Sequence, residues 1–161
     1  MEKDFLKELE FLGVTARLKR LSDVLSYSIK ELYKANGIDI EPSWHLVFLM
    51  LKRQNKSTMT EIADALNLSQ AATTKMITRM TKKGYVVVLK DEHDSRKKIL
   101  QLSEKANTEL PKFEKIWDAG QKSIREILEP NMEFFKYLEE FETQINNKSF
   151  KDRAIEHLKN D

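Results

Sequence analysis

Residues 58–76, TMTEIADALNLSQAATTKM, decide how the centre of the chain folds. Thr58 and Glu61 have the spacing of a capping box, in which each side chain accepts a hydrogen bond from the other residue's backbone N–H, so a helix is expected to begin here. Apolar side chains then recur at the spacing of one helical face: Met59, Ile62, Ala63 and Leu66. The pattern predicts a short amphipathic helix that ends near Asn67.

Residues 67–69 are too few to form anything except a tight turn before a second helix. Ser69 is a favourable N-cap and Gly84 a favourable stop, so this helix is predicted over residues 70–83. Its buried stripe is expected to hold Ala72, Met76, Ile77 and Met80. Two short helices joined by such a turn indicate a helix-turn-helix unit.

A β-hairpin is predicted directly after this unit. Residues 85–89 are rich in β-branched side chains, and a second strand is expected over residues 99–102. The polar residues 90–97 between them form the tip. A hairpin that follows a helix-turn-helix is typical of a wing.

Longer helices are predicted on both sides of this region. Apolar residues recur at helical spacing over residues 5–35, and Pro42 suits the first turn of the helix that leads into residues 44–52. Beyond the hairpin, the expected helices cover residues 104–128, 130–145 and 150–158. We therefore expect a mainly α fold with a small β-hairpin wing, because glycine and proline are too scarce for a many-stranded sheet.

The organisation predicted is one intertwined domain with two functional regions. The winged helix-turn-helix lobe covers residues 42–103, and the helical dimerisation region covers residues 1–41 and 104–161. A monomer of this size cannot bury all the apolar residues of the outer helices, so a partner surface is expected for many of them. These residues are Leu110, Phe113, Ile116, Trp117, Ile124, Ile127, Leu128, Phe134, Phe135, Leu138 and Phe141.

The face of the second helix opposite its apolar stripe is polar and cationic. It holds Gln70, Thr73 or Thr74, Lys75, Thr78 and Arg79, and no acidic residue lies between Asp64 and Asp91. Such side chains can donate to base edges and phosphates in the major groove of duplex DNA. Ser69 and Gln70 could also meet a phosphate at the N-terminus of the helix.

The charge distribution points to the same partner. Residues 52–105 carry 12 Lys and Arg against 6 Asp and Glu, whereas the rest of the chain carries 16 against 20. A basic centre with acidic flanks is expected when one segment faces a polyanion. The alternative is a solvated basic face without a partner.

The motifs of this central region together resemble those of the MarR family of transcription regulators. They are TMTEIADALNLSQAATTKM at 58–76, KGY at 83–85, DSR at 94–96 and LQLS at 100–103, and the resemblance covers residues 42–110. It implies a homodimer with interlocked terminal helices, a recognition helix in the major groove and a wing arginine in the minor groove. The DNA-facing set that it implies is Ser69, Gln70, Thr73, Thr74, Lys75, Arg79 and Arg96.

Two residues of the predicted wing can each be interpreted in two ways. Asp94 either orients Arg96, as the resemblance implies, or only ends the strand. Arg96 itself is either a minor-groove contact or a solvated arginine. The sequence departs from the family in having Met76 and Met80 where leucine is common, and in continuing beyond Ile145.

The resemblance also implies an effector pocket between the dimerising helices and the winged lobe. The candidates for lining it are Tyr27, Trp44, His45 and Phe48, and the expected ligand is a small aromatic or lipophilic molecule. Packing in the hydrophobic core is the alternative for these residues.

Other kinds of function find no support in the sequence. The chain has no cysteine, and its three histidines are isolated, so we expect no metal and no cofactor. It lacks the motifs of nucleophilic, zinc-dependent and phosphate-binding catalysis, so we do not expect an enzyme. The polar start of the chain and the absence of long apolar runs favour a cytoplasmic protein without a membrane partner.

The function expected is therefore a homodimeric transcription regulator, a repressor in the simplest case, that binds double-stranded DNA at a pseudo-palindromic operator and is released by its effector. The alternative is a winged-helix module that binds a protein partner and contacts DNA only non-specifically.

Overall fold

The computed structural model describes residues 4–90 and 98–160, which form two compact units. The first unit runs to Ile116 and the second begins at Trp117, inside one long helix, α6 (Glu104–Leu128). Each unit is described by itself. The described residues are mainly helical with one small sheet, which confirms the predicted fold class.

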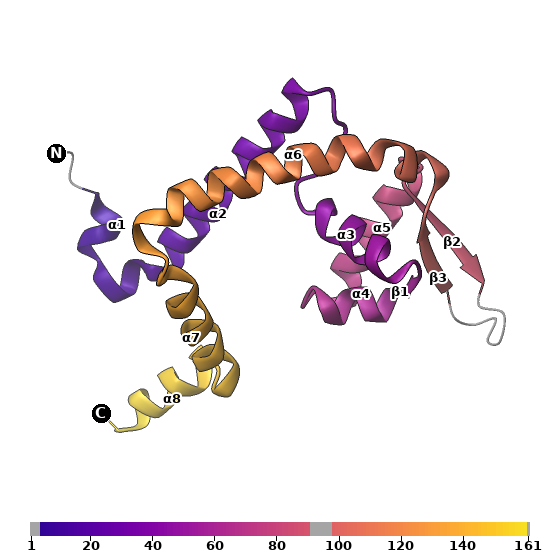
Figure 1. The fold of residues 1–161 in the computed structure, drawn as a ribbon. Helices are drawn as coiled ribbons and strands as arrows, with labels where there is room; N and C mark the ends of the chain where they lie inside the picture. The colour runs from indigo at the N-terminus through magenta and orange to yellow at the C-terminus, as the bar shows by residue number, and fades with distance from the viewer. Residues whose placement is uncertain (1–3, 91–97, 161) are drawn as a thin grey trace. The chain divides into compact units, whose positions relative to one another are not determined.

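The first unit contains the following elements in chain order: α1 (Phe5–Glu8), η1 (Glu10–Gly13), α2 (Val14–Ala35), α3 (Trp44–Gln54), β1 (Ser57–Thr58), α4 (Met59–Ala65), α5 (Gln70–Lys82), β2 (Val86–Lys90), β3 (Lys98–Leu102) and the start of α6. The second unit contains the end of α6, then η2 (Glu129–Asn131), α7 (Phe134–Asn147) and α8 (Phe150–Asn160). Figure 1 shows α3, α4 and α5 gathered beside the hairpin that β2 and β3 form.

The prediction of one continuous helix over residues 5–35 is wrong. The backbone turns between α1 and α2, where Glu10 has a φ of 46° and residues 10–13 form a 3₁₀ turn. Gly13 makes this turn possible, because a Cβ atom at this position would lie 2.1 Å from the carbonyl oxygen of Leu6. Apolar spacing gave no sign of the break, since it continues across the turn.

The helix-turn-helix forms as its sequence predicts. The Thr58 hydroxyl accepts a hydrogen bond from the N–H of Glu61 (3.2 Å), and the Glu61 carboxylate accepts one from the N–H of Thr58 (2.7 Å), which completes the capping box of α4. Asn67 then adopts a φ of 49° in the turn. The Ser69 hydroxyl caps α5 by accepting from the N–H of Ala72 (3.2 Å).

Ile77 and Met80 of α5 are buried as predicted, but Thr73 takes the place of Ala72 in the buried stripe. Thr73, Ile77 and Met80 are buried, whereas Ala72 is exposed and Met76 is half-buried. Thr73 can occupy the core because its hydroxyl donates to the carbonyl oxygen of Ser69 (3.1 Å), which satisfies the polar group inside the helix. The prediction that Thr73 belongs to the exposed face is therefore wrong.

The sheet has one strand more than predicted. Its order is β1-β3-β2, all antiparallel, with Ser57 opposite Leu100 and Val86 opposite Leu102. A strand as short as β1 shows no alternation from which a sequence could reveal it. Ser57 is buried, and its hydroxyl donates to the Gln54 side chain (2.5 Å).

Four aromatic rings form the centre of the core in the first unit. Tyr85 contacts Phe48, Phe113 and Trp44 edge to face, with ring centroids 5.5, 5.8 and 6.3 Å apart. These contacts join α3, the start of the hairpin and α6. Leu110 and Phe113 are buried here, so the prediction that these two residues need a partner surface is wrong.

The hydroxyl of Tyr85 donates a hydrogen bond to the Glu109 carboxylate (3.1 Å). Burial, together with the negative charge of Glu109, raises the pKa of Tyr85 to about 12. The fold therefore favours the neutral phenol. This contribution to stability is complete below the ordinary pKa of about 10 and is lost as the pH rises from there through about 12.

We expect a Tyr85→Phe variant to lose this pH dependence. The difference in unfolding free energy between wild type and variant should shrink by about 2 kcal/mol between pH ~10 and ~12. Urea unfolding of both proteins at several pH values measures it, and the titration of lysines, which the two proteins share, cancels. A difference that stays constant with pH would contradict the assignment.

A second comparison tests the register of α5. Thr73→Ala should lower the unfolding free energy by about 1–2 kcal/mol, because it removes a buried methyl group and a buried hydrogen bond. Thr74→Ala, at the exposed neighbouring position, should change it by less than about 0.5 kcal/mol. Urea unfolding gives both values, and equal effects would show that Thr73 is not the inward-facing residue.

Candidate nucleic-acid interface

The exposed side of α5 carries most of the side chains predicted to face DNA. Ser69, Gln70, Thr74, Lys75 and Arg79 are all exposed. They follow one another at intervals of one, four, one and four residues, so they form two adjacent rows along the helix. Thr73 does not join them, because its side chain points into the core and bonds to the backbone.

The position of α5 in the first unit is fixed at both ends. Ser69 caps its start, and Gly84 ends it with a φ of 79°, a conformation that glycine adopts without strain. The N–H of Tyr85 then donates to the carbonyl oxygen of Met80 (2.9 Å), so the chain turns directly from the helix into the core and the hairpin. The exposed rows are therefore held at a defined angle to the sheet.

The wing begins as predicted, but its tip lies outside the described residues. The last described pair of the hairpin is Lys90 opposite Lys98, and both lysines are exposed. Asp94 and Arg96 fall in the segment 91–97, so their roles stay predictions. The described part of the hairpin places two positive charges next to that segment.

Carboxylates from outside α5 hold two cations at its C-terminal end. The Arg79 guanidinium donates from Nη1 to Oε1 of Glu41 at 2.6 Å, and the Lys83 ammonium forms an ion pair with Asp39. Asp39 and Glu41 belong to the segment that connects α2 to α3. Sequence analysis missed both pairs, because the partners lie 38 and 44 residues apart and no local spacing signals such contacts.

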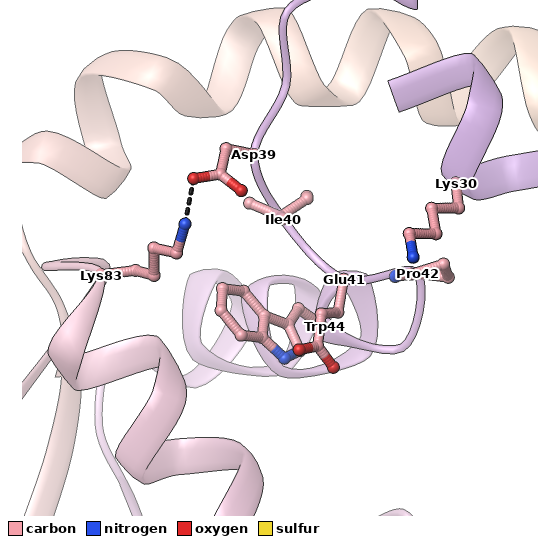
Figure 2. Close-up of a pocket in the computed structure, with 7 residues that line it drawn as sticks. All are labelled: Lys30, Asp39, Ile40, Glu41, Pro42, Trp44 and Lys83. Carbon is pink, nitrogen blue, oxygen red and sulfur yellow. Dashed lines mark hydrogen bonds and ion pairs between the residues drawn. The ribbon is translucent and has the colours of Figure 1, made fainter. Parts of the chain in front are cut away.

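A cavity of about 480 Å³ opens beside these ion pairs. Figure 2 shows its wall, formed by Lys30, Asp39, Ile40, Glu41, Pro42, Trp44 and Lys83. Trp44 is only 2% exposed, and its buried indole N–H has no hydrogen-bond partner among the residues that the structure describes. A buried donor without an acceptor costs about 1–3 kcal/mol.

Only one of the four residues predicted for an effector pocket lines this cavity. Trp44 does so, whereas Phe48 is buried in the aromatic core and Tyr27 is 66% exposed on α2. His45 is half-buried, with its Nδ1 2.6 Å from the carbonyl oxygen of Pro42. For Phe48 the alternative of core packing is correct. The cavity wall is more polar than the prediction assumed, since it carries four charged side chains.

Among residues 4–90 and 98–160, no group of three or more His, Cys, Asp or Glu side chains has the arrangement of a metal site. Nor is any helix within these ranges both long enough and apolar enough to cross a membrane.

Comparison with known proteins finds sequence similarity in the central region of the chain. Residues 38–97 match the model of the MarR family. The transcriptional regulator AdcR of Streptococcus pyogenes serotype M6 is 43% identical over 58 residues, which are 36% of this chain and 40% of that protein. The chain thus spans less than half the length of this curated relative.

Solved structures share the fold over a greater length. The structure of reduced AbfR bound to DNA has a TM-score of 0.69 and 22% identity, and it covers 91% of this chain and 98% of its own. The repressor CouR, bound to a 23-mer DNA duplex, also has a TM-score of 0.69, with 21% identity over 91% of this chain and 99% of its own. Residues 38–97, which include the helix-turn-helix, are thus similar in sequence to the MarR family, and the solved structures share the fold over most of the chain.

Proposed function

We propose that this chain is a transcription regulator that binds duplex DNA through the exposed side of α5. The observation that carries the proposal is the composition of that side, which offers hydroxyl, amide, ammonium and guanidinium donors and contains no acidic residue. The B-DNA major groove is about 12 Å wide, admits one α-helix and presents a distinct pattern of donors and acceptors at each base pair. The relative AdcR is a transcriptional regulator, and the AbfR and CouR structures contain bound DNA. Both similarities support the same function.

Different parts of this surface would serve different purposes. Lys75 and Arg79 lie on the rows that would enter the major groove, where a bidentate contact can select a base. Ser69 and Gln70 lie at the start of α5, where free backbone N–H groups favour a phosphate. Arg96 at the wing tip would enter the minor groove and respond to its width, with Asp94 orienting it.

The regulator that we propose acts as a homodimer. In the first unit, α2 exposes a series of large apolar side chains: Leu18, Leu21, Val24, Leu25 and Leu32. In the second unit, α7 exposes Phe134, Phe135, Phe141 and Ile145. Apolar surface of this extent on two helices is typical of an interface between subunits. Two copies related by a two-fold axis would also place two α5 helices on successive turns of the DNA.

A winged-helix module that binds a protein partner, and DNA only non-specifically, is the competing function. The two differ in what they require of α5. Binding to phosphates alone needs positive charge anywhere on the surface, whereas reading a sequence needs donors along one side of a helix. The ordered rows on α5 favour the regulator.

Selection from random DNA duplexes followed by sequencing tests the proposal. We expect a symmetric motif with half-sites ~10–10.5 base pairs, or a multiple of that, apart, because each subunit would place one α5 in the major groove. A selection without any preferred sequence would favour the competing module instead. Light scattering should give twice the 18.9 kDa of one chain, and a stable monomer at micromolar concentration would contradict the dimer.

The proposed regulator releases DNA when a small aromatic molecule enters the cavity beside Trp44. The cavity is lined by Trp44 and by the cationic side chains of Lys30 and Lys83. Its wall includes the segment that joins α2 to α3, so a bound ligand would favour one position of that segment over another. A ligand changes DNA affinity only by the difference in its own affinity for the two states.

Tryptophan fluorescence tests this site, since the chain has only two tryptophans, Trp44 and Trp117. In a Trp117→Phe variant, benzoate should change the emission saturably, because its carboxylate can pair with the lysines that line the cavity together with Trp44. Toluene, which has the same ring and no acceptor, should bind more weakly. No saturable response to benzoate, or an equal response to both molecules, would contradict the site.

A further inference from the structure

The cations at the C-terminal end of α5 are already engaged in the free protein. Arg79 and Lys83 are paired with Glu41 and Asp39, and Figure 2 shows the Lys83–Asp39 contact directly. All four side chains are about half exposed or more, so none of these charges is hidden from a second partner. The carboxylates thus occupy positions beside α5 at which a DNA phosphate would meet the same two cations.

The backbone of the segment that connects α2 to α3 determines where these two carboxylates lie. Burial alternates along it: Ile38 and Ile40 are buried, with 6% and 7% exposure, whereas Asp39 and Glu41 are exposed. The N–H of Ile38 also donates to the carbonyl oxygen of Tyr33 at the end of α2 (2.9 Å). Two buried anchors therefore direct two successive acidic side chains to the same side, toward α5.

We infer that Asp39 and Glu41 occupy Lys83 and Arg79 in the free protein in place of acceptor groups of DNA, and that DNA must displace these carboxylates before the two cations can bind it. The inference rests on the proposed function and adds an internal competitor to it. Each pair is a charge-assisted contact, the kind that a phosphate would replace. Exposed pairs contribute little to folding stability, so they can open without unfolding the lobe.

Two other roles for Glu41 predict different results. If Glu41 only tethers the connecting segment, its removal should lower stability and leave DNA affinity unchanged. If Glu41 positions Arg79 for a base contact, its removal should weaken DNA binding. Competition alone predicts tighter binding when the carboxylate is removed, and predicts that this gain depends on Arg79.

The experiment is a double-mutant cycle read out as DNA affinity. Wild type, Glu41→Gln, Arg79→Gln and the double variant are titrated with the selected duplex and with a scrambled duplex of equal length, at several salt concentrations. Glu41→Gln should tighten binding to both duplexes about two- to fivefold, the range that an exposed ion pair supplies. The gain should decrease with salt and disappear in the Arg79→Gln background.

A matched variant, Glu31→Gln, controls for net charge. Glu31 is an exposed residue of α2 in the same unit, and its replacement changes the charge by the same amount. It should tighten binding less than Glu41→Gln does. Asp39→Asn, compared with the same variant in a Lys83→Gln background, repeats the cycle for the second pair.

The outcomes separate the inference from the proposed function. Unchanged or weaker binding by Glu41→Gln, or an equal gain with and without Arg79, overturns the competition while leaving the regulator in place. If wild type binds neither duplex at low salt, the proposed function is wrong and the competition is wrong with it. Urea unfolding of each variant confirms that the comparison concerns folded protein.

Discussion

The packing of Tyr85 against Phe48 and Phe113 is the contact on which the rest of the first unit depends. Tyr85 stands where α5 has just ended and β2 begins, and its ring meets one aromatic side chain from α3 and one from α6. The helices α3 and α6, which are distant in the sequence, are thereby fixed to the junction between α5 and β2. The exposed rows of α5 keep their direction because the residue that follows the helix is anchored in this core.

Local signals account for the parts of the fold that could be predicted. The capping box at Thr58, the cap at Ser69 and the β-branched run after Gly84 each act within a few residues, so their meaning does not depend on the rest of the chain. The exposed positions of Lys75 and Arg79 followed from the same helical spacing. Family resemblance then supplied the connection between these elements.

The features that could not be predicted depend on contacts across the chain. Thr73 rather than Ala72 faces the core because a backbone carbonyl satisfies its hydroxyl, which no hydrophobicity pattern shows. The break before α2 depends on the close approach of Gly13 to Leu6. The ion pair of Glu41 with Arg79 joins residues that only the folded chain brings together. Aromatic residues in the sequence did not predict a binding site reliably, since large rings pack in a hydrophobic core as readily as they line a pocket.

The two-residue strand β1 has a mechanical consequence. Thr58 pairs with Ile99 in the sheet and, at the same time, caps the first turn of α4. One residue is therefore both the edge of the sheet and the end of a helix, with no flexible joint between them. Thr58 thus connects β3 to α4 directly, and the tight turn connects α4 to α5. We therefore expect the hairpin and the two helices to move together when either of them is displaced.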